Sequence, residues 1–221
     1  CIRDRIGSGG KTTYIHELKD KYVSLNKSVL MCTTTHMLIE EGTLVDPSYD
    51  EIMHRIETYG YCHAGSRSDD SKIEGLDSKL LNQLKQVVDV ILIEADGSKH
   101  LPLKYPNVNE PVLDSDTDEV VLISNLNGLN QPVKDVVHRY ELANLDPNEL
   151  VTPRIMQDLI RAYLKKLNKP VKIHVNGAMD LYTRCVRVLL EENVDVNIIQ
   201  KEWFNTVSYT HLRAHETSQD L

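Results

Sequence analysis

The chain has 221 residues, of which 41% are apolar and 26% are charged, and its formal net charge at neutral pH is −8. This length fits one α/β domain, and the acidic balance argues against a general nucleic-acid-binding protein, which normally carries a basic face. No stretch approaches the roughly 20 apolar residues of a membrane-spanning helix, and four separated cysteines without a CxxC pair argue against a disulfide framework or a structural zinc site. We therefore expect a cytoplasmic protein that binds neither nucleic acid nor membrane.

The two ends of the chain differ from the rest. The segment CIRDRI at the start is charged where a buried strand would be apolar, and the first residue is Cys1 instead of Met. The segment from Val207 to Leu221 is polar and shows no clean period. We expect the natural N-terminus to be missing, residues 1–206 to form one domain, and residues 207–221 to be a non-native tail.

A glycine-rich segment, IGSGGKTT, precedes a helical pattern that begins near Thr12. Its glycines allow the backbone to approach an anion closely, Lys11 can reach terminal phosphate oxygens, and the Thr12 hydroxyl can bind Mg²⁺. Anions also bind readily at a helix N-terminus. The match to the usual phosphate-loop spacing is partial, because the first expected glycine falls on Arg5, and a plain glycine-rich turn is the alternative. The predicted nucleotide-binding residues are Gly7, Gly9, Gly10, Lys11, Thr12 and Thr13.

Strand-like and helix-like segments then alternate along the chain. Strands are predicted at Ser28–Cys32, Val87–Ile93, Glu119–Ser124, Val171–Val175 and Val196–Gln200, and helices after Thr12 and at Asp77–Lys85, Thr152–Lys166 and Ala178–Glu192. This alternation predicts an α/β fold with a mostly parallel sheet, helices on both faces, and a P-loop NTPase-like architecture. The segment Glu40–Gly75 is irregular and is predicted to be a mobile loop or lid, with Cys62 in a loop.

Two carboxylates follow the most apolar predicted strand. Glu94 and Asp96 come directly after Val87–Ile93, and residues two apart on a strand point the same way. A phosphate-loop fold needs a carboxylate at such a strand end to hold Mg²⁺ or its water shell. We therefore predict a metal site of Thr12, Glu94 and Asp96, with both carboxylates lying past the buried run. A solvated strand end is the alternative.

Polar residues near this strand end are candidates for a second anion site. Thr34 and Thr35 follow the strand Ser28–Cys32, and Lys99 and Lys104 lie just beyond the acidic pair. They could bind a substrate phosphate or a pterin pyrophosphate. Ordinary solvated loops explain them equally well.

Several of these segments together resemble the YqeC family, which is associated with selenium cofactor biosynthesis and with accessory proteins of selenium-dependent molybdenum hydroxylases. The segments are GSGGKTT, TTTHM, LIEADGSKHLPLK, NEPVL and VHRYEL, in that order. The resemblance implies a P-loop NTPase-like fold and a role in maturing or inserting a labile selenium-containing cofactor. It also implies functional positions beyond the loop, at Thr33–Thr35, Glu94, Asp96, Gly97, Ser98, Lys104, Glu110 and Pro111.

We therefore predict a Mg²⁺- and ATP-dependent ATPase in which Lys11, Glu94 and Asp96 are catalytic, with Asp96 slightly the more important carboxylate. GTP is the less favoured nucleotide, because the segment Asn176–Asp180 lacks the N-K-x-D spacing that reads guanine. A molybdenum hydroxylase or its cofactor-maturation proteins are the expected partners. A small-molecule kinase or ligase-like phosphotransferase, and a non-catalytic binding module gated by nucleotide, are the alternatives. The second anion or substrate site comprises Thr34, Thr35, Ser98, Lys99, Lys104 and Glu110.

Overall fold

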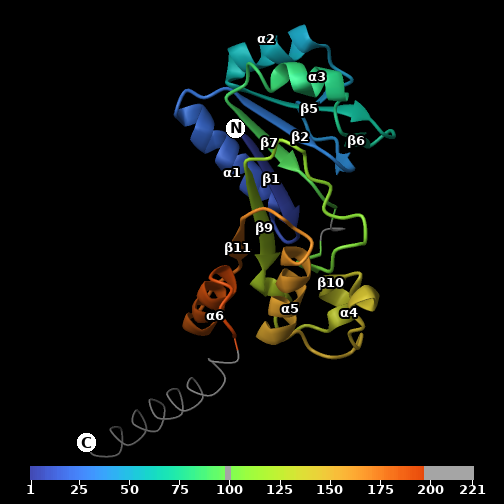
Figure 1. Ribbon diagram of the computed structural model, residues 1–221, viewed down its shortest axis with the longest axis vertical. Helices are drawn as coiled ribbons and strands as arrows, with labels where there is room; N and C mark the ends of the chain where they lie inside the picture. The colour runs from blue at the N-terminus through green and yellow to red at the C-terminus, as the bar shows by residue number, and fades with distance from the viewer. Residues whose placement is uncertain (98–100, 197–221) are drawn as a thin grey trace, which may run out of the picture.

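A largely parallel sheet organises the chain in this computed structural model, which describes residues 1–97 and 101–196 (Figure 1). Its strands are β1 (Ile2–Gly7), β2 (Val29–Thr33), β3 (Met37–Leu38), β4 (Leu44–Val45), β5 (Tyr61–Arg67), β6 (Lys72–Glu74), β7 (Val90–Glu94), β9 (Glu119–Asn125) and β11 (Val171–Asn176). Among the described residues these nine strands form one sheet in the order β11-β9-β1-β7-β2-β5-β6-β3, with β4 beside β5. Only β6 runs antiparallel to its neighbours there, so the expected α/β fold with a mostly parallel sheet is confirmed.

Helices cover both faces of this sheet. They are α1 (Lys11–Ser24), α2 (Tyr49–Tyr59), α3 (Ser78–Leu84), α4 (Val133–Val136), α5 (Pro153–Leu164) and α6 (Leu181–Glu191). Short 3₁₀ turns occur at Leu126–Gly128 and Tyr140–Ala143, and a separate pair of parallel strands joins β8 (Leu103–Lys104) to β10 (Val137–His138). This small pair lies near the carboxyl end of the main sheet, beside α4 and α5 (Figure 1).

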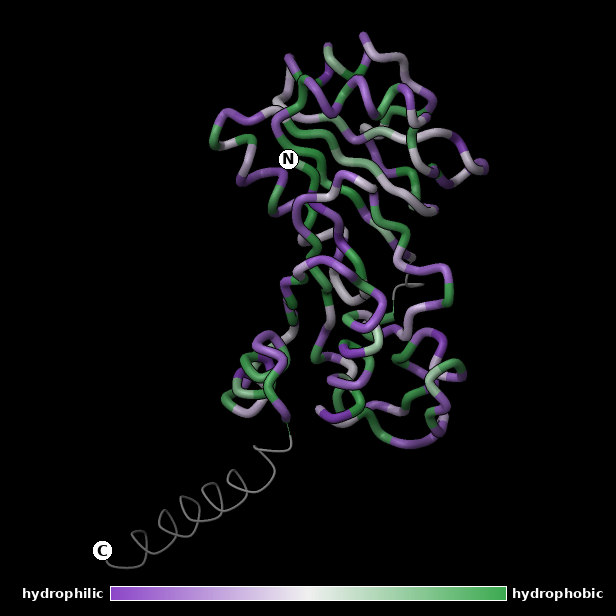
Figure 2. Tube along the Cα trace, in the orientation of Figure 1, coloured by the Kyte–Doolittle hydropathy of each residue, from purple (hydrophilic) through white to green (hydrophobic). Residues whose placement is uncertain are grey.

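The apolar residues of the central strands alternate between the two faces, as a pleated strand requires. In β2 and β7, Met31 and Leu92 pack with Ile15 of α1. The intervening residues of the same two strands, Cys32 and Ile93 among them, pack with α2 and α3 on the opposite face. The green of hydrophobic residues accordingly runs along the inner strands in Figure 2. Burial on both faces of the sheet explains why Val90–Ile93 is apolar at every position.

The predicted helices begin where their capping residues indicate. The Thr152 side chain accepts a hydrogen bond from the Ile155 N–H, and Pro153 occupies the first turn of α5. Asp180 caps α6 in a reciprocal arrangement with Thr183. The strand expected at Val196–Gln200 and the tail at 207–221 lie outside the described residues, apart from Val196 itself.

The prediction of an irregular lid at Glu40–Gly75 is wrong. The segment contains β4, α2, β5 and β6, and α2 has a complete capping box between Ser48 and Glu51. Strand β5 was not predicted, because its sequence, YCHAGSR, has small and polar residues instead of an apolar run. Its residues Cys62 and Ala64 are buried by α2 and by the neighbouring strands, which are long-range contributions that local sequence does not reveal.

The charged segment at the start of the chain also forms a strand, β1, at the centre of the sheet. Asp4 and Arg5 are fully buried there. Asp4 accepts hydrogen bonds from the Thr117 hydroxyl at 2.7 Å and the Asp114 N–H at 3.0 Å, and burial nevertheless raises the pKa of Asp4 to about 6. The Arg5 guanidinium lies 5.3 Å from the centre of the Tyr14 ring. Backbone pairing with β7 and β9 therefore outweighs the poor strand composition.

Every helix within residues 1–97 and 101–196 is too short or too polar to cross a bilayer.

Candidate functional site

The glycine-rich segment forms a tight loop between β1 and α1, at the carboxyl end of the sheet. Gly7 has a left-handed φ of 86°, and a Cβ atom there would lie 2.1 Å from the carbonyl oxygen of Ile123. Because that contact is far below any tolerated distance, only glycine fits where the loop leaves β1. The loop is thus pressed against the neighbouring strand β9.

Helix α1 begins at this loop without a side-chain cap. Its N-cap residue is Gly10, which makes no side-chain capping hydrogen bond, and the first turn has no acidic residue. The first turn of a helix presents backbone N–H groups and a partial positive charge, which together attract anions. A cleft of about 910 Å³ opens here, and its lining includes Gly9, Gly10, Lys11, Thr12 and Thr13.

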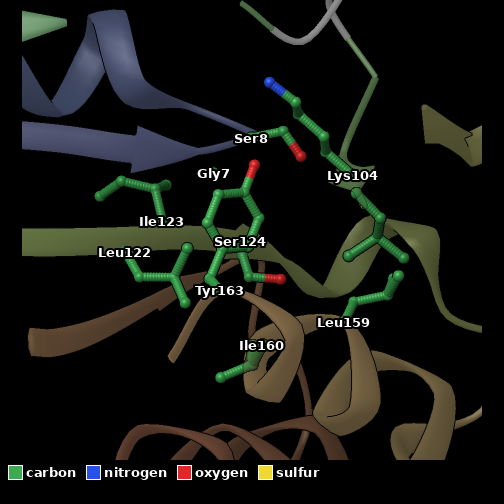
Figure 3. Close-up of a pocket in the computed structure, with 10 residues that line it drawn as sticks. Gly7, Ser8, Lys104, Leu122, Ile123, Ser124, Leu159, Ile160 and Tyr163 are labelled. Carbon is green, nitrogen blue, oxygen red and sulfur yellow. The ribbon is translucent and has the colours of Figure 1, made fainter. Parts of the chain in front are cut away.

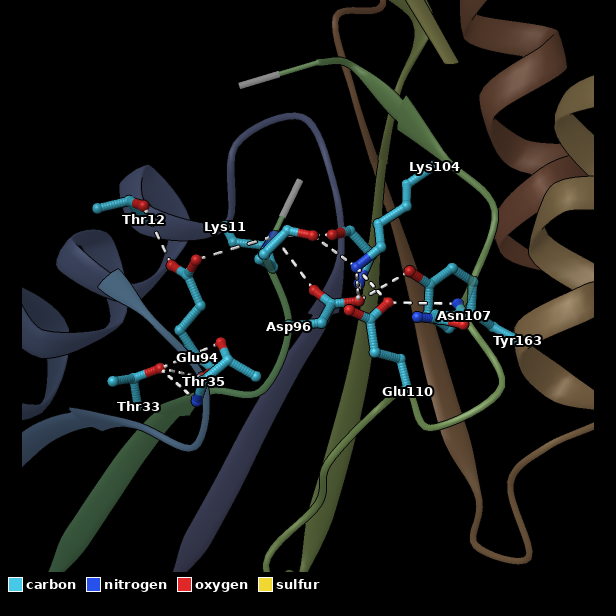
Figure 4. Close-up of polar contacts among 12 residues, drawn as sticks. Lys11, Thr12, Thr33, Thr35, Glu94, Asp96, Lys104, Asn107, Glu110 and Tyr163 are labelled. Atoms are coloured by element: carbon cyan, nitrogen blue, oxygen red, sulfur yellow. Dashed lines mark hydrogen bonds and ion pairs between the residues drawn. The ribbon is translucent and has the colours of Figure 1, made fainter. Parts of the chain in front are cut away.

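The predicted catalytic residues meet at Lys11. Its Nζ atom donates a 2.7 Å hydrogen bond to the Gly7 carbonyl and lies 3.2 Å from Asp96 Oδ1 and 3.9 Å from Glu94 Oε1 (Figure 4). Both carboxylates therefore point to the same side of the strand end, as their spacing predicts. The lysine is only 4% exposed, so its charge is held between the loop and the two acids.

Glu94 is the carboxylate that faces the cleft. The Thr12 hydroxyl donates to Glu94 Oε2 at 3.2 Å, and both residues line the cleft. Burial, assisted by the nearby charge of Asp96, raises the pKa of Glu94, although Lys11 and Thr12 oppose the shift. Pairing a threonine hydroxyl with a carboxylate beside the helix start gives two oxygen ligands of the kind that Mg²⁺ prefers.

Asp96 lies inside the protein. The prediction that both carboxylates lie past the buried run is wrong, because Glu94 is itself a buried residue at the end of β7. Asp96 is fully buried, and its Oδ2 atom accepts hydrogen bonds from the Gly7 N–H at 3.0 Å and the Tyr163 hydroxyl at 2.7 Å. Lys104 Nζ lies 3.3 Å from the same atom. Figure 4 shows Asp96 between the two lysines. After β7 the backbone passes beneath α5, and this helix covers Asp96. Asp96 therefore contacts both the glycine loop, through Gly7, and α5, through Tyr163.

A second group of charges forms the wall of the cleft near β8 and β10. Glu110 forms ion pairs with two basic residues, Lys104 and Arg139. The Lys104 Nζ atom lies 2.7 Å from Glu110 Oε2. Burial opposes ionisation of Glu110, but the hydrogen bonds from Arg139 and Lys104 prevail and lower its pKa to about 2. Glu110, His138 and Arg139 line the cleft, whereas Lys104 is 3% exposed and lies behind them.

The remaining members of the predicted second anion site divide into three cases. Thr35 lines the cleft. Thr34 does not line it, because its hydroxyl donates to the Val112 carbonyl at 2.6 Å. Ser98 and Lys99 lie outside the described residues.

A metal ion at this site would depend on more than protein ligands. In the described part of the chain no three His, Cys, Asp or Glu residues cluster as a metal centre. Oδ1 of Asp96 has no hydrogen-bond partner among these residues and depends on Lys11 for its compensating charge. Mg²⁺ commonly binds through one or two carboxylates, waters and substrate phosphates, so Thr12 and Glu94 fit such an ion when a phosphate is present.

The cysteines contribute no reactive thiol to the cleft. Cys32 and Cys62 are buried in β2 and β5, so the predicted loop position of Cys62 is wrong. Burial raises the pKa of both thiols, to about 11 for Cys62. Because a thiol reacts as its thiolate, neither residue is suited to carry selenium or sulfur.

Sequence reasoning missed a carboxylate at the cleft. Glu40 lines it, and Glu40 Oε2 lies 3.0 Å from His16 Nε2 and 3.7 Å from His63 Nδ1. His16 is one helical turn beyond Thr12, which gives a weak local signal, since residues four apart share a helix face. His63 comes from β5, and no sequence pattern links it to the others.

A much smaller cavity lies on the far side of the loop. It measures about 10 Å³ and is bordered by Gly7, Lys104 and Tyr163 together with apolar residues of β9 and α5 (Figure 3). This volume holds at most about one water molecule. This cavity is therefore too small for a nucleotide, unlike the open cleft beside α1.

Known proteins resemble this chain. A sequence model of one protein family, described as YqeC protein, matches residues 5–141. A relative from Escherichia coli (strain K12), called "Uncharacterized protein YqeC", is 27% identical over 168 residues, which cover 71% of this chain and 66% of the relative. The chain thus spans just under two thirds of the length of that relative. The match to the family includes the loop, the acidic strand end and Arg139.

Proposed function

The chain belongs to the YqeC family, and on this basis we propose that it binds a nucleoside triphosphate with Mg²⁺ at the start of α1 and hydrolyses it. The main support is the uncapped, glycine-initiated helix start that opens into the cleft beside Lys11. A phosphate chain is the ligand that best matches a row of backbone N–H groups and a lysine.

In this proposal Lys11 exchanges its present partners for phosphate. Its ammonium turns from the Gly7 carbonyl toward the β- and γ-phosphates, while Asp96 keeps Lys104 as its compensating charge. Thr12 and Glu94 hold Mg²⁺, which supplies neutralising charge to the phosphate oxygens. Asp96 holds the loop through the Gly7 N–H.

Glu40 is our candidate for orienting the attacking water. It lines the same cleft as Thr12 and Glu94, and its carboxylate is close enough to Glu94 to raise that residue's pKa further. His16 and His63 hold it from two elements, α1 and β5. A carboxylate fixed in this way can accept a proton or a hydrogen bond from water in one defined orientation.

The physiological role follows from the family resemblance alone. We propose that nucleotide turnover serves selenium cofactor biosynthesis or insertion in a selenium-dependent molybdenum hydroxylase, in the cytoplasm, with that enzyme or its maturation proteins as partners. ATP is the proposed nucleotide, because Asn176–Asp180 lacks the guanine-reading spacing.

A phosphotransferase is the second candidate. The cleft is large, and Glu110, His138 and Arg139 border it together with the phosphate loop. Such a border could hold an acceptor molecule close to a bound γ-phosphate. ADP release that requires an added acceptor would favour this candidate over an ATPase.

The test is calorimetric titration with ATP and GTP, with and without Mg²⁺, combined with phosphate-release assays. Lys11→Ala should abolish binding, whereas Lys21→Ala, on an exposed position of the same helix, should leave it unchanged. Glu40→Gln should lower turnover and preserve binding. Tight binding without any turnover would indicate a nucleotide-gated binding module, and no binding of either nucleotide would refute the proposal.

A further inference from the structure

We propose that Asn125 and Asn176 are positioning residues that aim the Gly10 N–H of the phosphate loop into the cleft. Neither residue touches the cleft itself. The inference deepens the proposed function, because it rests on the loop being a phosphate-binding element, and it adds the part of the protein that keeps the loop in a binding shape.

The two asparagines converge on one backbone atom. Asn125 ends β9 and Asn176 ends β11, and the two residues are direct partners in the parallel register of these strands. The Nδ2 atom of each lies 3.1 Å from the carbonyl oxygen of Gly9 and donates to it. A carbonyl oxygen has two lone pairs, so it can accept both hydrogen bonds at once.

Contacts of the amide oxygens agree with this orientation, and for Asn125 the backbone N–H of Asn127 fixes it. Oδ1 of Asn125 accepts the backbone N–H of Asn127 at 2.9 Å, and Oδ1 of Asn176 lies 2.9 Å from Nε2 of His174. Both oxygens are therefore occupied on the sides away from the loop. Each amide is left with its NH₂ group toward Gly9, which is the orientation that a carbonyl oxygen requires.

The two hydrogen bonds to the Gly9 carbonyl also fix the direction of the Gly10 N–H. The C=O of Gly9 and the N–H of Gly10 belong to one planar trans peptide, so they point in opposite directions. Because the carbonyl is held toward the ends of β9 and β11, the Gly10 N–H is turned away from them, toward the cleft that Gly9 and Gly10 line. A Cβ atom on Gly10 would lie 2.7 Å from Asn176 Nδ2, so this close approach needs glycine.

In the Gly7–Ser8 peptide, the C=O and the N–H also point in opposite directions. The Gly7 carbonyl accepts a hydrogen bond from Lys11, and the N–H of Ser8, in the same peptide, donates in the other direction to the Ile123 carbonyl at 2.9 Å. The loop is thus held by alternating contacts with its surroundings. Preorganised backbone donors bind an anion without the entropic cost of ordering them first.

The test compares the full chain with Asn125→Ala, Asn176→Ala and the double variant. Hydrogen exchange of the amides at residues 8–13 reports the order of the loop without any ligand, and titration with ATP, GTP and inorganic tripolyphosphate in Mg²⁺ reports binding. We expect faster exchange confined to the loop, about threefold weaker binding in each single variant, and about tenfold weaker binding in the double variant. The loss should be equal for the three ligands, because the tether acts on phosphate and not on a base.

Asn148→Ala is the matched control, since Asn148 is exposed and its side chain accepts from Lys134. It should match the unmodified protein in every measurement. Unchanged loop exchange in the double variant overturns the inference, and so does exchange that rises across α5 as well, which would indicate general destabilisation. Absence of binding by the unmodified protein refutes the proposed function instead, while the exchange measurement still decides the role of the two asparagines.

Discussion

Glu94 and Asp96 have different environments, although their spacing in the sequence predicts the same role for both. Glu94 faces the cleft and holds Thr12, whereas Asp96 is fully buried and compensates Lys11 and Lys104. The same two-residue spacing thus gives one acid that lines the cleft and one that is internal. The expectation that Asp96 matters slightly more for turnover stays a prediction, but the structure gives it a different cause, which is loss of loop order.

Glu94→Gln should weaken Mg²⁺-dependent nucleotide binding by about tenfold or more without lowering stability. The raised pKa means that the fold favours the neutral form of this side chain, so a neutral isostere should be tolerated or stabilising. Because protonated Glu94 is a poor ligand for Mg²⁺, Mg²⁺-dependent binding by the unmodified protein should weaken as the pH falls through the raised pKa of Glu94. Titration across pH, with thermal unfolding in parallel, measures both effects, and full Mg²⁺ dependence in the variant would contradict the metal assignment.

Asp96→Asn should behave in the opposite way and destabilise the protein by about 3 kcal/mol. The amide leaves the Lys11 and Lys104 ammonium groups without the shared buried charge. Urea unfolding compares this variant with Glu94→Gln. If Asp96→Asn unfolds at the same urea concentration as the unmodified protein, Asp96 is not the internal counter-charge described here.

Between elements, ion pairs and hydrogen bonds reinforce the packing of β8, β10 and α5. Lys104 of β8 and Arg139, which follows β10, meet at Glu110 on the intervening loop. Lys166, just beyond α5, donates to the carbonyl oxygens of Val108 and Glu110. These polar contacts add to the apolar packing of Leu103 and Val137 in the same region, and the contribution of Glu110 should depend on pH.

Glu110→Gln should lower the free energy of unfolding at neutral pH by about 1–3 kcal/mol. The folded-state pKa of Glu110 lies below its ordinary value of 4.5, at about 2. The ionised form therefore stabilises the fold above about pH 4.5, and this contribution disappears as the pH falls from there to about 2. Unfolding curves of the two proteins should converge over that window. Glu57→Gln, at an exposed position of α2, is the control and should show no such convergence.

For the whole molecule, ligand binding and stability are linked. A ligand present at about 100 times its Kd stabilises the folded state by about 2.7 kcal/mol, so Mg²⁺ with ATP should raise the midpoint of thermal unfolding by several degrees. Lys11→Ala should abolish this rise, although the variant itself will begin from a lower midpoint because Asp96 loses a partner. A rise of equal size in both proteins would show that the nucleotide binds elsewhere.

The sequence alone determined the features that depend on neighbouring residues. The glycine loop and its helix, the helix that begins after Thr152, and an apolar strand before the acidic pair follow from local backbone and side-chain chemistry. Each was predicted, although β7 begins at Val90 instead of Val87, and α6 begins at Leu181 instead of Ala178. The position of the site at the carboxyl end of the strands follows too, because parallel strands bring their ends to one edge.

Only the tertiary structure decided which residues those ends meet. Tyr163 reaches Asp96 across 67 residues and Asn176 reaches Gly9 across 167, and neither contact leaves a periodic trace in the sequence. Strand β5 was missed for the same reason, since its small residues are buried by α2 and by distant strands and do not form an apolar run of their own. Local pattern fixes where the glycine loop and the acidic strand end lie, whereas burial and distant partners fix which carboxylate faces the cleft and which contacts the loop.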